Sequence, residues 1–242
     1  MIWRHELKYS LATGPARRLM AGLAPLLQPD RHAGWSDART YTLQPGYQIR
    51  SCYFDDPRHS AVHDKLSGVD RRDKYRLRIY DGQDQPILLE RKIRSGGLSR
   101  KESLRLDRAQ ADALLAGRID VLTELSHPDQ TLPLRFYQVF RTSLLRPVCL
   151  VDYVRQPFIW PDGNVRITID SQLSTARWAG NFWDPDAAAI PVQAADEVIL
   201  EVKYDHFLPD FIRAKLAASG LLPLALSKYI LCINDQPGGI TI

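Results

Sequence analysis

The sequence predicts an α+β fold, in which an antiparallel β-barrel of about eight strands forms a tunnel covered by helices. Several segments alternate apolar and polar residues with the period of two that is typical of strands. Turn signals separate such segments at Asp81-Gly82, Ser95-Gly96-Gly97 and Pro161-Asp162-Gly163. Helical patterns lie between and after the strands without a strict strand-helix alternation, which favours antiparallel pairing.

The elements follow from local patterns. In chain order, the expected strands are residues 2–9, 46–54, two or three within 71–102, 148–158, 164–170 and 197–204. The expected helices are residues 13–27, 57–68, 106–125, 208–219 and 227–233, while 134–145 fits either type. Thr13 is expected to cap the first helix and Asp107 the third, because short polar side chains accept from free backbone N–H groups. Residues 30–45 and 171–195 lack a period and are expected to be loops.

Length and composition place the chain among ordinary globular proteins. The 242 residues, 45% hydrophobic and 25% charged, suit one domain spanning residues 1–242. The three cysteines lack zinc-site spacing and suit a reducing environment. No leader or membrane span is indicated, so a cytoplasmic location is expected, although a membrane-bound partner protein remains compatible. The net charge of +4 is modest, so the position of the charges matters more than their sum.

The most distinctive feature is the distribution of charge on the strands. In residues 72–80, one face carries Arg72, Lys74, Arg76 and Arg78, and the other face is largely apolar. A solvated outer face would give the same pattern on a single strand. However, three strands also contain Glu-x-Lys, and these pairs are Glu6-Lys8, Glu90-Lys92 and Glu201-Lys203. Residues two apart share one sheet face, so the strands are expected to project cations and carboxylates into a common space.

A common space of this kind predicts an anion and a metal as its occupants. Arginine and lysine bind phosphate oxygens, and carboxylates supply the oxygen ligands that Mg²⁺ or Mn²⁺ prefers. A closed, dry interior would cost several kcal/mol for each buried ion. The interior is therefore expected to be hydrated or occupied by a phosphate chain.

At these motifs, the sequence resembles the VTC domain, a polyphosphate polymerase domain of the triphosphate tunnel metalloenzyme (CYTH-like) superfamily. The resemblance runs in order through segments 4–9, 50–55, 74–80, 89–92 with Lys101, 153–155, 165–170, 200–203 and 227–229. It implies an antiparallel tunnel with a divalent metal, Mn²⁺ or Mg²⁺. Triphosphatases of the superfamily often begin with Glu-x-Glu-x-Lys, whereas Arg4 takes the first carboxylate position here. This departure favours the polyphosphate branch and weakens the case for a two-metal site built from carboxylates.

The resemblance also implies roles for individual residues. Phosphate binding is expected of Lys8, Arg76, Arg78, Lys92, Lys101, Arg155, Arg166 and Lys228, and Lys74 and Lys203 complete the set on the same strand faces. The metal is expected on Glu201, with Glu6 and Glu90 as helpers. The residues expected to take part directly in catalysis are Lys8, Arg76, Arg78, Lys92, Arg155 and Glu201. Asp152 and Asp170 are open to a metal or a structural role, and Ser227 to a helix cap or a phosphate contact.

The leading functional hypothesis is metal-dependent transfer of a phosphoryl group from a nucleoside triphosphate to polyphosphate, by positioning and electrostatics. An inorganic or nucleoside triphosphatase and a non-catalytic polyphosphate-binding module remain as alternatives. A nucleic-acid binder is disfavoured, because Tyr75 lies on the face opposite Arg76 and no RNA-binding motif is present. The sequence alone does not separate lengthening, cutting and holding of a phosphate chain, and the oligomeric state is left open.

Overall fold

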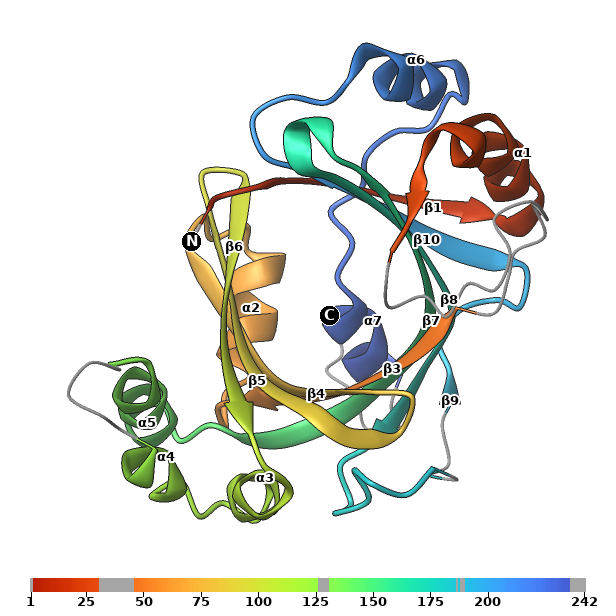
Figure 1. Ribbon diagram of the computed structural model, residues 1–242. Helices are drawn as coiled ribbons and strands as arrows, with labels where there is room; N and C mark the ends of the chain where they lie inside the picture. The colour runs from red at the N-terminus through yellow and green to blue at the C-terminus, as the bar shows by residue number, and fades with distance from the viewer. Residues whose placement is uncertain (1, 31–45, 126–130, 186, 188–189, 236–242) are drawn as a thin grey trace.

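The computed structural model describes residues 2–30, 46–125, 131–185, 187 and 190–235. An antiparallel sheet curls around the centre of the molecule, with its strands in the order β1-β10-β8-β7-β3-β4-β5-β6 (Figure 1). The strands are β1 (His5–Ala12), β3 (Tyr47–Asp55), β4 (Arg72–Tyr80), β5 (Gln83–Ser95), β6 (Leu98–Leu106), β7 (Arg146–Trp160), β8 (Val165–Arg177) and β10 (Glu197–Tyr204). The short strands β2 (Gln28–Pro29) and β9 (Ile190–Pro191) pair with β7 and β8. The predicted eight-stranded antiparallel architecture is confirmed.

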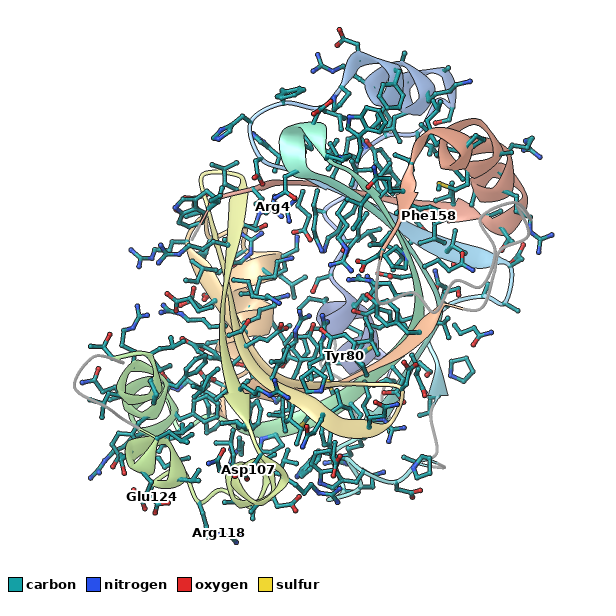
Figure 2. All side chains as sticks on the ribbon, in the orientation of Figure 1. Arg4, Tyr80, Asp107, Arg118, Glu124 and Phe158 are labelled. Carbon is teal, nitrogen blue, oxygen red and sulfur yellow. The ribbon has the colours of Figure 1, made fainter. Side chains whose placement is uncertain are left out.

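The two edges of the curled sheet meet at one backbone bridge. The N–H and C=O groups of Arg4 and Ser99 exchange two hydrogen bonds of 2.9 Å, which join the start of β1 to β6. Figure 2 shows Arg4 where these two segments approach each other. At this level the sheet is closed into a ring, so side chains of β1 and of β5 can contact each other across the closure.

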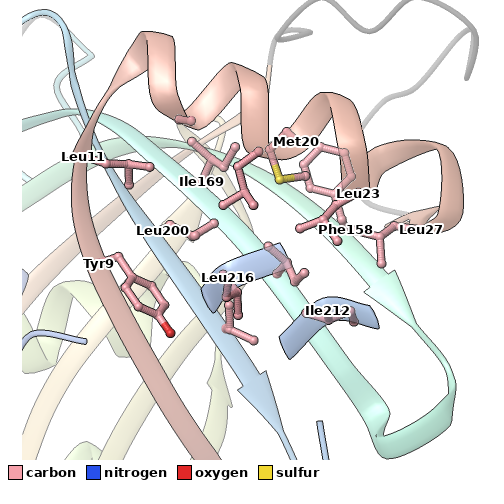
Figure 3. Close-up of a cluster of buried hydrophobic side chains, with 14 of the residues drawn as sticks. Tyr9, Leu11, Met20, Leu23, Leu27, Phe158, Ile169, Leu200, Ile212 and Leu216 are labelled. Carbon is pink, nitrogen blue, oxygen red and sulfur yellow. The ribbon is translucent and has the colours of Figure 1, made fainter. Parts of the chain in front are cut away.

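The described helices are α1 (Thr13–Leu23), α2 (Ser60–Leu66), α3 (Arg108–Leu115), α4 (Val121–Glu124), α5 (Leu132–Thr142), α6 (Asp210–Ala218) and α7 (Lys228–Asn234). Helices α1, α3, α4, α5 and α6 cover the convex face of the sheet, whereas Val62 of α2 packs in the concave cluster with α7. Helices α1 and α6 pack on β1, β10 and β8 through a cluster that includes Leu23, Leu200 and Ile212 (Figure 3). Helices α3, α4 and α5 bury the convex face of β3 to β6, with Phe136 and Leu77 in the cluster. Each fully buried leucine or phenylalanine contributes about 2 kcal/mol relative to an exposed one.

Helix α7 differs from the covering helices, because it lies on the concave side. Its Tyr229 and Ile230 pack against Tyr53, Tyr153 and Ile199, which alternate with residues of the convex clusters along their strands. Figure 1 shows α7 within the ring of strands. The C-terminal helix therefore contributes directly to the surface that the sheet encloses.

The hairpins that carry the central charges have the turn chemistry that the sequence predicts. Asp81 and Gly82 connect β4 to β5 with φ angles of 50° and 66°, and Gly96 and Gly97 connect β5 to β6 with φ angles of 58° and 76°. Left-handed backbone at both turn positions matches the right-handed twist of the strands. The register that follows places Lys74 opposite Lys92.

Some predicted boundaries were wrong. The helix expected over 106–125 is two helices, α3 and α4, because the chain turns at Gly117 with a φ of 81°. The predicted capping role of Asp107 is confirmed, since its side chain accepts from the backbone N–H of Gln110. Strand β8 continues to Arg177 through part of the expected 171–195 loop. In this extension Leu173, Thr175 and Ala176 are buried, which the sequence-based period did not reveal.

At the N-terminal side, the first strand is His5–Ala12 rather than residues 2–9. Thr13 is the first residue of α1, and its side chain does not make the expected capping bond. Its hydroxyl instead donates to the carbonyl of Asp196 at 2.8 Å, just before β10 begins. The undecided segment 134–145 is largely the helix α5. Of the expected 30–45 loop, residues 31–45 lie outside the described residues. Among the described residues, no helix has the length and apolar character needed to cross a membrane.

Candidate functional site

The predicted phosphate-binding cations all lie on the concave side of the sheet. Their positions follow from the strand period, which turns Arg76 and Arg78 inward because Tyr75, Leu77 and Ile79 join the convex core. The ten cations come from seven strands and one helix: Lys8, Lys74, Arg76, Arg78, Lys92, Lys101, Arg155, Arg166, Lys203 and Lys228. The described carboxylates that contact these cations are Glu6, Asp30, Glu90, Asp170 and Glu201. Positive charge is therefore in excess on the concave side.

Two glutamates on neighbouring strands form one centre of this site. Lys203 Nζ lies 2.9 Å from Glu201 Oε2 and 3.6 Å from Glu6 Oε1, and Lys8 Nζ lies 3.4 Å and 3.7 Å from the same two residues. Lys92 reaches Glu6 from β5 across the closure of the sheet, at 2.6 Å. The β1–β10 register explains the pairing, since Glu6 is opposite Lys203 and Lys8 is opposite Glu201. The pairs Glu6-Lys8 and Glu201-Lys203 thus form ion pairs with each other across the two strands.

A second centre joins β7, β8 and α7. Arg155 donates to Asp170 through Nε and Nη2, both at 2.7 Å, and its Nη2 lies 3.4 Å from Glu201. Lys228 Nζ lies 2.6 Å from Asp170 Oδ2 and 3.1 Å from Glu201 Oε1. Glu201 therefore connects the two centres, and it is only 3% exposed.

A third centre surrounds Glu90 on β5. Arg76 donates to Glu90 Oε2 at 2.8 Å, Lys101 donates to Oε1, and Arg78 Nη1 lies 3.9 Å from Oε2. Glu90 is completely buried, and it is opposite Arg76 in the register of β4 and β5. Glu90, the carboxylate of the predicted pair Glu90-Lys92, therefore positions Arg76 and Arg78.

Tyrosine hydroxyls orient three of the arginines without neutralising them. Arg76 Nη1 donates to the Tyr53 hydroxyl at 3.0 Å, and Arg78 Nη2 donates to the Tyr153 hydroxyl at 2.9 Å. Arg166 Nη2 donates in the same way to the hydroxyl of Tyr47 at 3.0 Å. A hydroxyl acceptor satisfies one N–H of the guanidinium and leaves its charge available to a ligand.

Burial and crowding change the pKa values of the lysines in different directions. Burial lowers the pKa of Lys92 to about 7. Its effect, together with the smaller effects of Lys8 and Lys203, is larger than the opposing effect of Glu6. Burial also lowers the pKa of Lys203, against the effect of Glu201. Burial alone would lower the pKa of Lys228, but Asp170 and Glu201 raise it above its usual range.

The glutamates remain ionised in this surrounding. Burial acts to raise the pKa of Glu201, but Lys203, Lys228 and Lys8 hold it well below its usual range. The pKa of Glu6 is likewise lowered, since its lysine neighbours outweigh burial. Both carboxylates are therefore anionic at neutral pH and can act as oxygen ligands.

The structure brings together most, but not all, of the predicted site. Arg166 lies at its margin, where it forms an ion pair of 2.7 Å with Asp30. Lys101 has a side chain that is 47% exposed, and it contacts the site through an ion pair with Glu90. Asp152, left open as a metal ligand, pairs with Arg50 at 2.8 Å and has a structural role.

Other site residues were missed or left open by sequence reasoning. Asp170 is part of the second centre, and Ser227 both caps α7 and accepts a hydrogen bond from Lys74. Tyr53 and Tyr153 were not predicted to orient arginines. Tyr153 lies two residues before Arg155 on β7, so the period of two was an available signal for it.

The resemblance implies a divalent metal, and two of the carboxylates are suited to hold it. Mg²⁺ is commonly bound by one or two carboxylates together with the phosphates of the substrate. Glu6 and Glu201 fit this arrangement, because they share Lys8 and Lys203 as neighbours and are both ionised. Glu90 is enclosed by the arginines of the third centre, and no group of three or more Asp, Glu, His and Cys side chains in the described part of the chain is placed to hold an ion. A metal here would need ligand oxygens from the phosphates.

Comparisons with known proteins agree with this fold. The family model of the VTC domain matches residues 3–235. A candidate adenylyl cyclase from Hippeastrum, described as having a dominant triphosphatase activity, is similar in structure, with a TM-score of 0.50 and 14% identity over 94% of this chain and 93% of that chain. A candidate adenylate cyclase from Bacillus halodurans has a TM-score of 0.46 and 11% identity, over 91% and 93% of the two chains. A comparison with curated proteins gave no match.

The curled antiparallel sheet is a fold that this chain shares with the Hippeastrum protein. The match over residues 3–235 shows that the chain belongs to the VTC domain family. The family and the fold predicted from the sequence are both confirmed.

Proposed function

We propose that this protein is a metal-dependent phosphotransferase that moves the terminal phosphoryl group of a nucleoside triphosphate to a polyphosphate chain. The observation that supports this proposal is the excess of cations over carboxylates on the concave side, which the half-buried Lys74 illustrates. Its ammonium is hydrogen-bonded to Ser227 Oγ at 2.6 Å, and no described carboxylate forms an ion pair with it. Partly buried cations in excess are unfavourable unless an anion of high charge density joins them. A linear chain of phosphates supplies that charge.

The arginines are suited to hold the phosphoryl group during transfer. Charge on the transferred group is spread over its equatorial oxygens, and fixed N–H donors stabilise it without reorganisation. Glu90, Tyr53 and Tyr153 fix the guanidinium groups of Arg76 and Arg78 from the side of the sheet. The two arginines can therefore present their remaining N–H groups to a phosphate.

The lysines around Glu6 and Glu201 can exchange partners when substrate binds. Lys8 and Lys203 contact both carboxylates, so they can move to phosphate oxygens while the carboxylates take a cation. A bound Mg²⁺ or Mn²⁺ on Glu6 and Glu201 would neutralise phosphate charge and orient the chain. Arg155 stays fixed by Asp170 and supports Glu201 from the other side.

A triphosphatase is the second candidate, and the position of α7 favours it. Helix α7 packs on the concave faces of β7 and β8, and Tyr229 is anchored by a hydrogen bond of 2.7 Å to Asp55. A helix in this place narrows the space through which a growing chain would leave. In that case, water would accept the phosphoryl group at the same cations.

The deciding experiment is incubation of the purified protein with ATP and Mn²⁺, followed by separation of the products. ADP together with acid-insoluble polyphosphate supports the polymerase, whereas free phosphate without polymer supports the triphosphatase. Tight triphosphate binding without any turnover would contradict both and leave a binding module. A chelator control shows whether turnover depends on the metal.

A further inference from the structure

A row of cations continues beyond the phosphate site toward α2. Arg72 lies two residues before Lys74 on the same face of β4, and Arg94 lies two residues after Lys92 on β5. The register places Arg72 directly opposite Arg94, in the row that follows the opposed pair Lys74 and Lys92. Like charges directly opposite each other on neighbouring strands are destabilising. Two such rows in succession need an explanation other than stability.

Helix α2 adds a third cation to this end of the row. The helix packs against β4, and the field of Arg72 and Arg94 adds to burial in lowering the pKa of Lys65. Burial and Arg94 likewise lower the pKa of Arg72. Lys65, Arg72 and Arg94 are therefore close enough to repel one another.

The acidic side chains nearby do not balance these three cations. Asp64 and Asp70 are close enough to raise the pKa of Arg72, yet burial and Arg94 outweigh them. The Asp70 carboxylate accepts from the backbone N–H of Gly96 at 2.8 Å and from the Ser95 hydroxyl at 3.2 Å, so it is used to hold the β5–β6 turn. The cluster keeps a net positive charge.

We propose that Lys65, Arg72 and Arg94 form a second anion subsite, which binds the part of a polyphosphate chain that extends past the interior cations. The inference rests on the proposed function. Two residues along a strand span about 7 Å, so the subsite lies one step outward from Lys74 and Lys92. A triphosphate held at the interior cations does not need this subsite, whereas a longer chain does. The subsite therefore selects for chain length.

The test compares two ligands on the full chain at low ionic strength, where exposed charges are least screened. Inorganic triphosphate and long-chain sodium polyphosphate are titrated calorimetrically into the wild type and into the triple variant Lys65→Ala, Arg72→Ala and Arg94→Ala. The expected result is a loss of about tenfold in polyphosphate affinity and less than about twofold in triphosphate affinity. Retained triphosphate binding also shows that the variant is folded.

The matched control removes three exposed cations elsewhere, by Arg17→Ala, Arg18→Ala and Arg118→Ala, and so changes the net charge equally. An equal loss of polyphosphate affinity in this control would overturn the subsite, because the effect would then be one of overall charge. Unchanged polyphosphate affinity in the Lys65, Arg72 and Arg94 variant, or equal losses for both ligands, would also overturn it. Failure of the wild type to bind either ligand would instead refute the proposed function, and the inference with it.

Discussion

The ammonium of Lys74 on β4 donates a hydrogen bond of 2.6 Å to the hydroxyl of Ser227, the residue that caps α7. The ring of Tyr229 lies 5.4 Å from the same ammonium. Both contacts are made to uncharged groups, so α7 is attached to the site without neutralising it. The hydrogen bond between Lys74 and Ser227 therefore holds α7 against β4 and leaves the positive charge of Lys74 available to a ligand.

The first prediction concerns this lysine. Replacing Lys74 by methionine is expected to raise the free energy of unfolding by about 1 kcal/mol at neutral pH, because a half-buried charge without a carboxylate partner among the described residues is removed. The same change should weaken triphosphate binding about tenfold, since one cation is lost from the site. Chemical denaturation and calorimetric titration measure the two effects.

The pH dependence of this stabilisation has a definite sign. Burial, together with Lys8 and Lys92, lowers the pKa of Lys74 well below its usual range. Between that lowered pKa and about 10, the unfolded chain binds more protons than the folded chain, so wild-type stability rises with pH. The advantage of the methionine variant is expected to shrink as pH rises toward about 10. An advantage that grows with pH would contradict the assigned burial of the charge.

The second prediction tests the metal-binding role of Glu201. Glu201→Gln should reduce metal-dependent turnover at least about 100-fold, because an anionic ligand of the metal is lost. Triphosphate binding without metal should be retained in part, since Lys8, Lys203 and Lys228 remain. The matched control is Glu197→Gln, an exposed position on the same strand, which should keep full activity. Full activity in the Glu201 variant would remove this residue from the site.

The third prediction tests whether the basic face of β4 points to the ligand. The double variant Arg76→Glu and Arg78→Glu should lower triphosphate affinity more than about 100-fold, through lost contacts and new repulsion. Reversal of Arg17 and Arg18 on the exposed face of α1 makes the same change in net charge. Near-equal affinities of the two variants would mean that the β4 cations do not bind the phosphates. Circular dichroism checks that both variants fold.

The fourth prediction concerns the anchor of α7. Tyr229→Phe should lower the free energy of unfolding by about 1 kcal/mol, because the buried Asp55 carboxylate loses a hydrogen bond. Burial raises the pKa of Asp55 and the Tyr229 hydroxyl acts against this, so the pKa of Asp55 should rise further in the variant. The stability difference should therefore decrease as the pH falls through the raised pKa of Asp55, because the carboxyl group becomes protonated. A difference that is constant over this range would show that Asp55 does not sense the hydroxyl.

Much of the charged interior could be predicted from the sequence, because it depends on a local rule. The period of two assigns Arg76, Lys92 and Glu201 to one sheet face without knowledge of the strand order. The convex clusters confirm this assignment for β1, β4, β5 and β10. The roles of these residues in phosphate and metal binding stay predictions.

The remainder depends on contacts between distant segments. Glu90 lies in a different centre from Glu6 and Glu201, because different cations surround it. No local sequence pattern predicts this difference. Arg166 is drawn to Asp30, a residue that the sequence places in a loop. The position of α7 within the ring also depends on the complete barrel, since its short, largely apolar sequence would suit a covering helix equally well.

The bridge between Arg4 and Ser99 has a consequence for how the protein folds. The ring closes only when a segment near the N-terminus meets β6, and Glu201 completes the site from a strand much further along the chain. Such non-local pairings make folding slow, because the entropy of closing a large loop is lost before the favourable contacts between the strands form. Until β1 and β10 pair, the cations of β4 and β5 face one another without Glu6 and Glu201. Phosphate chains in the refolding buffer are therefore expected to accelerate the late steps of folding.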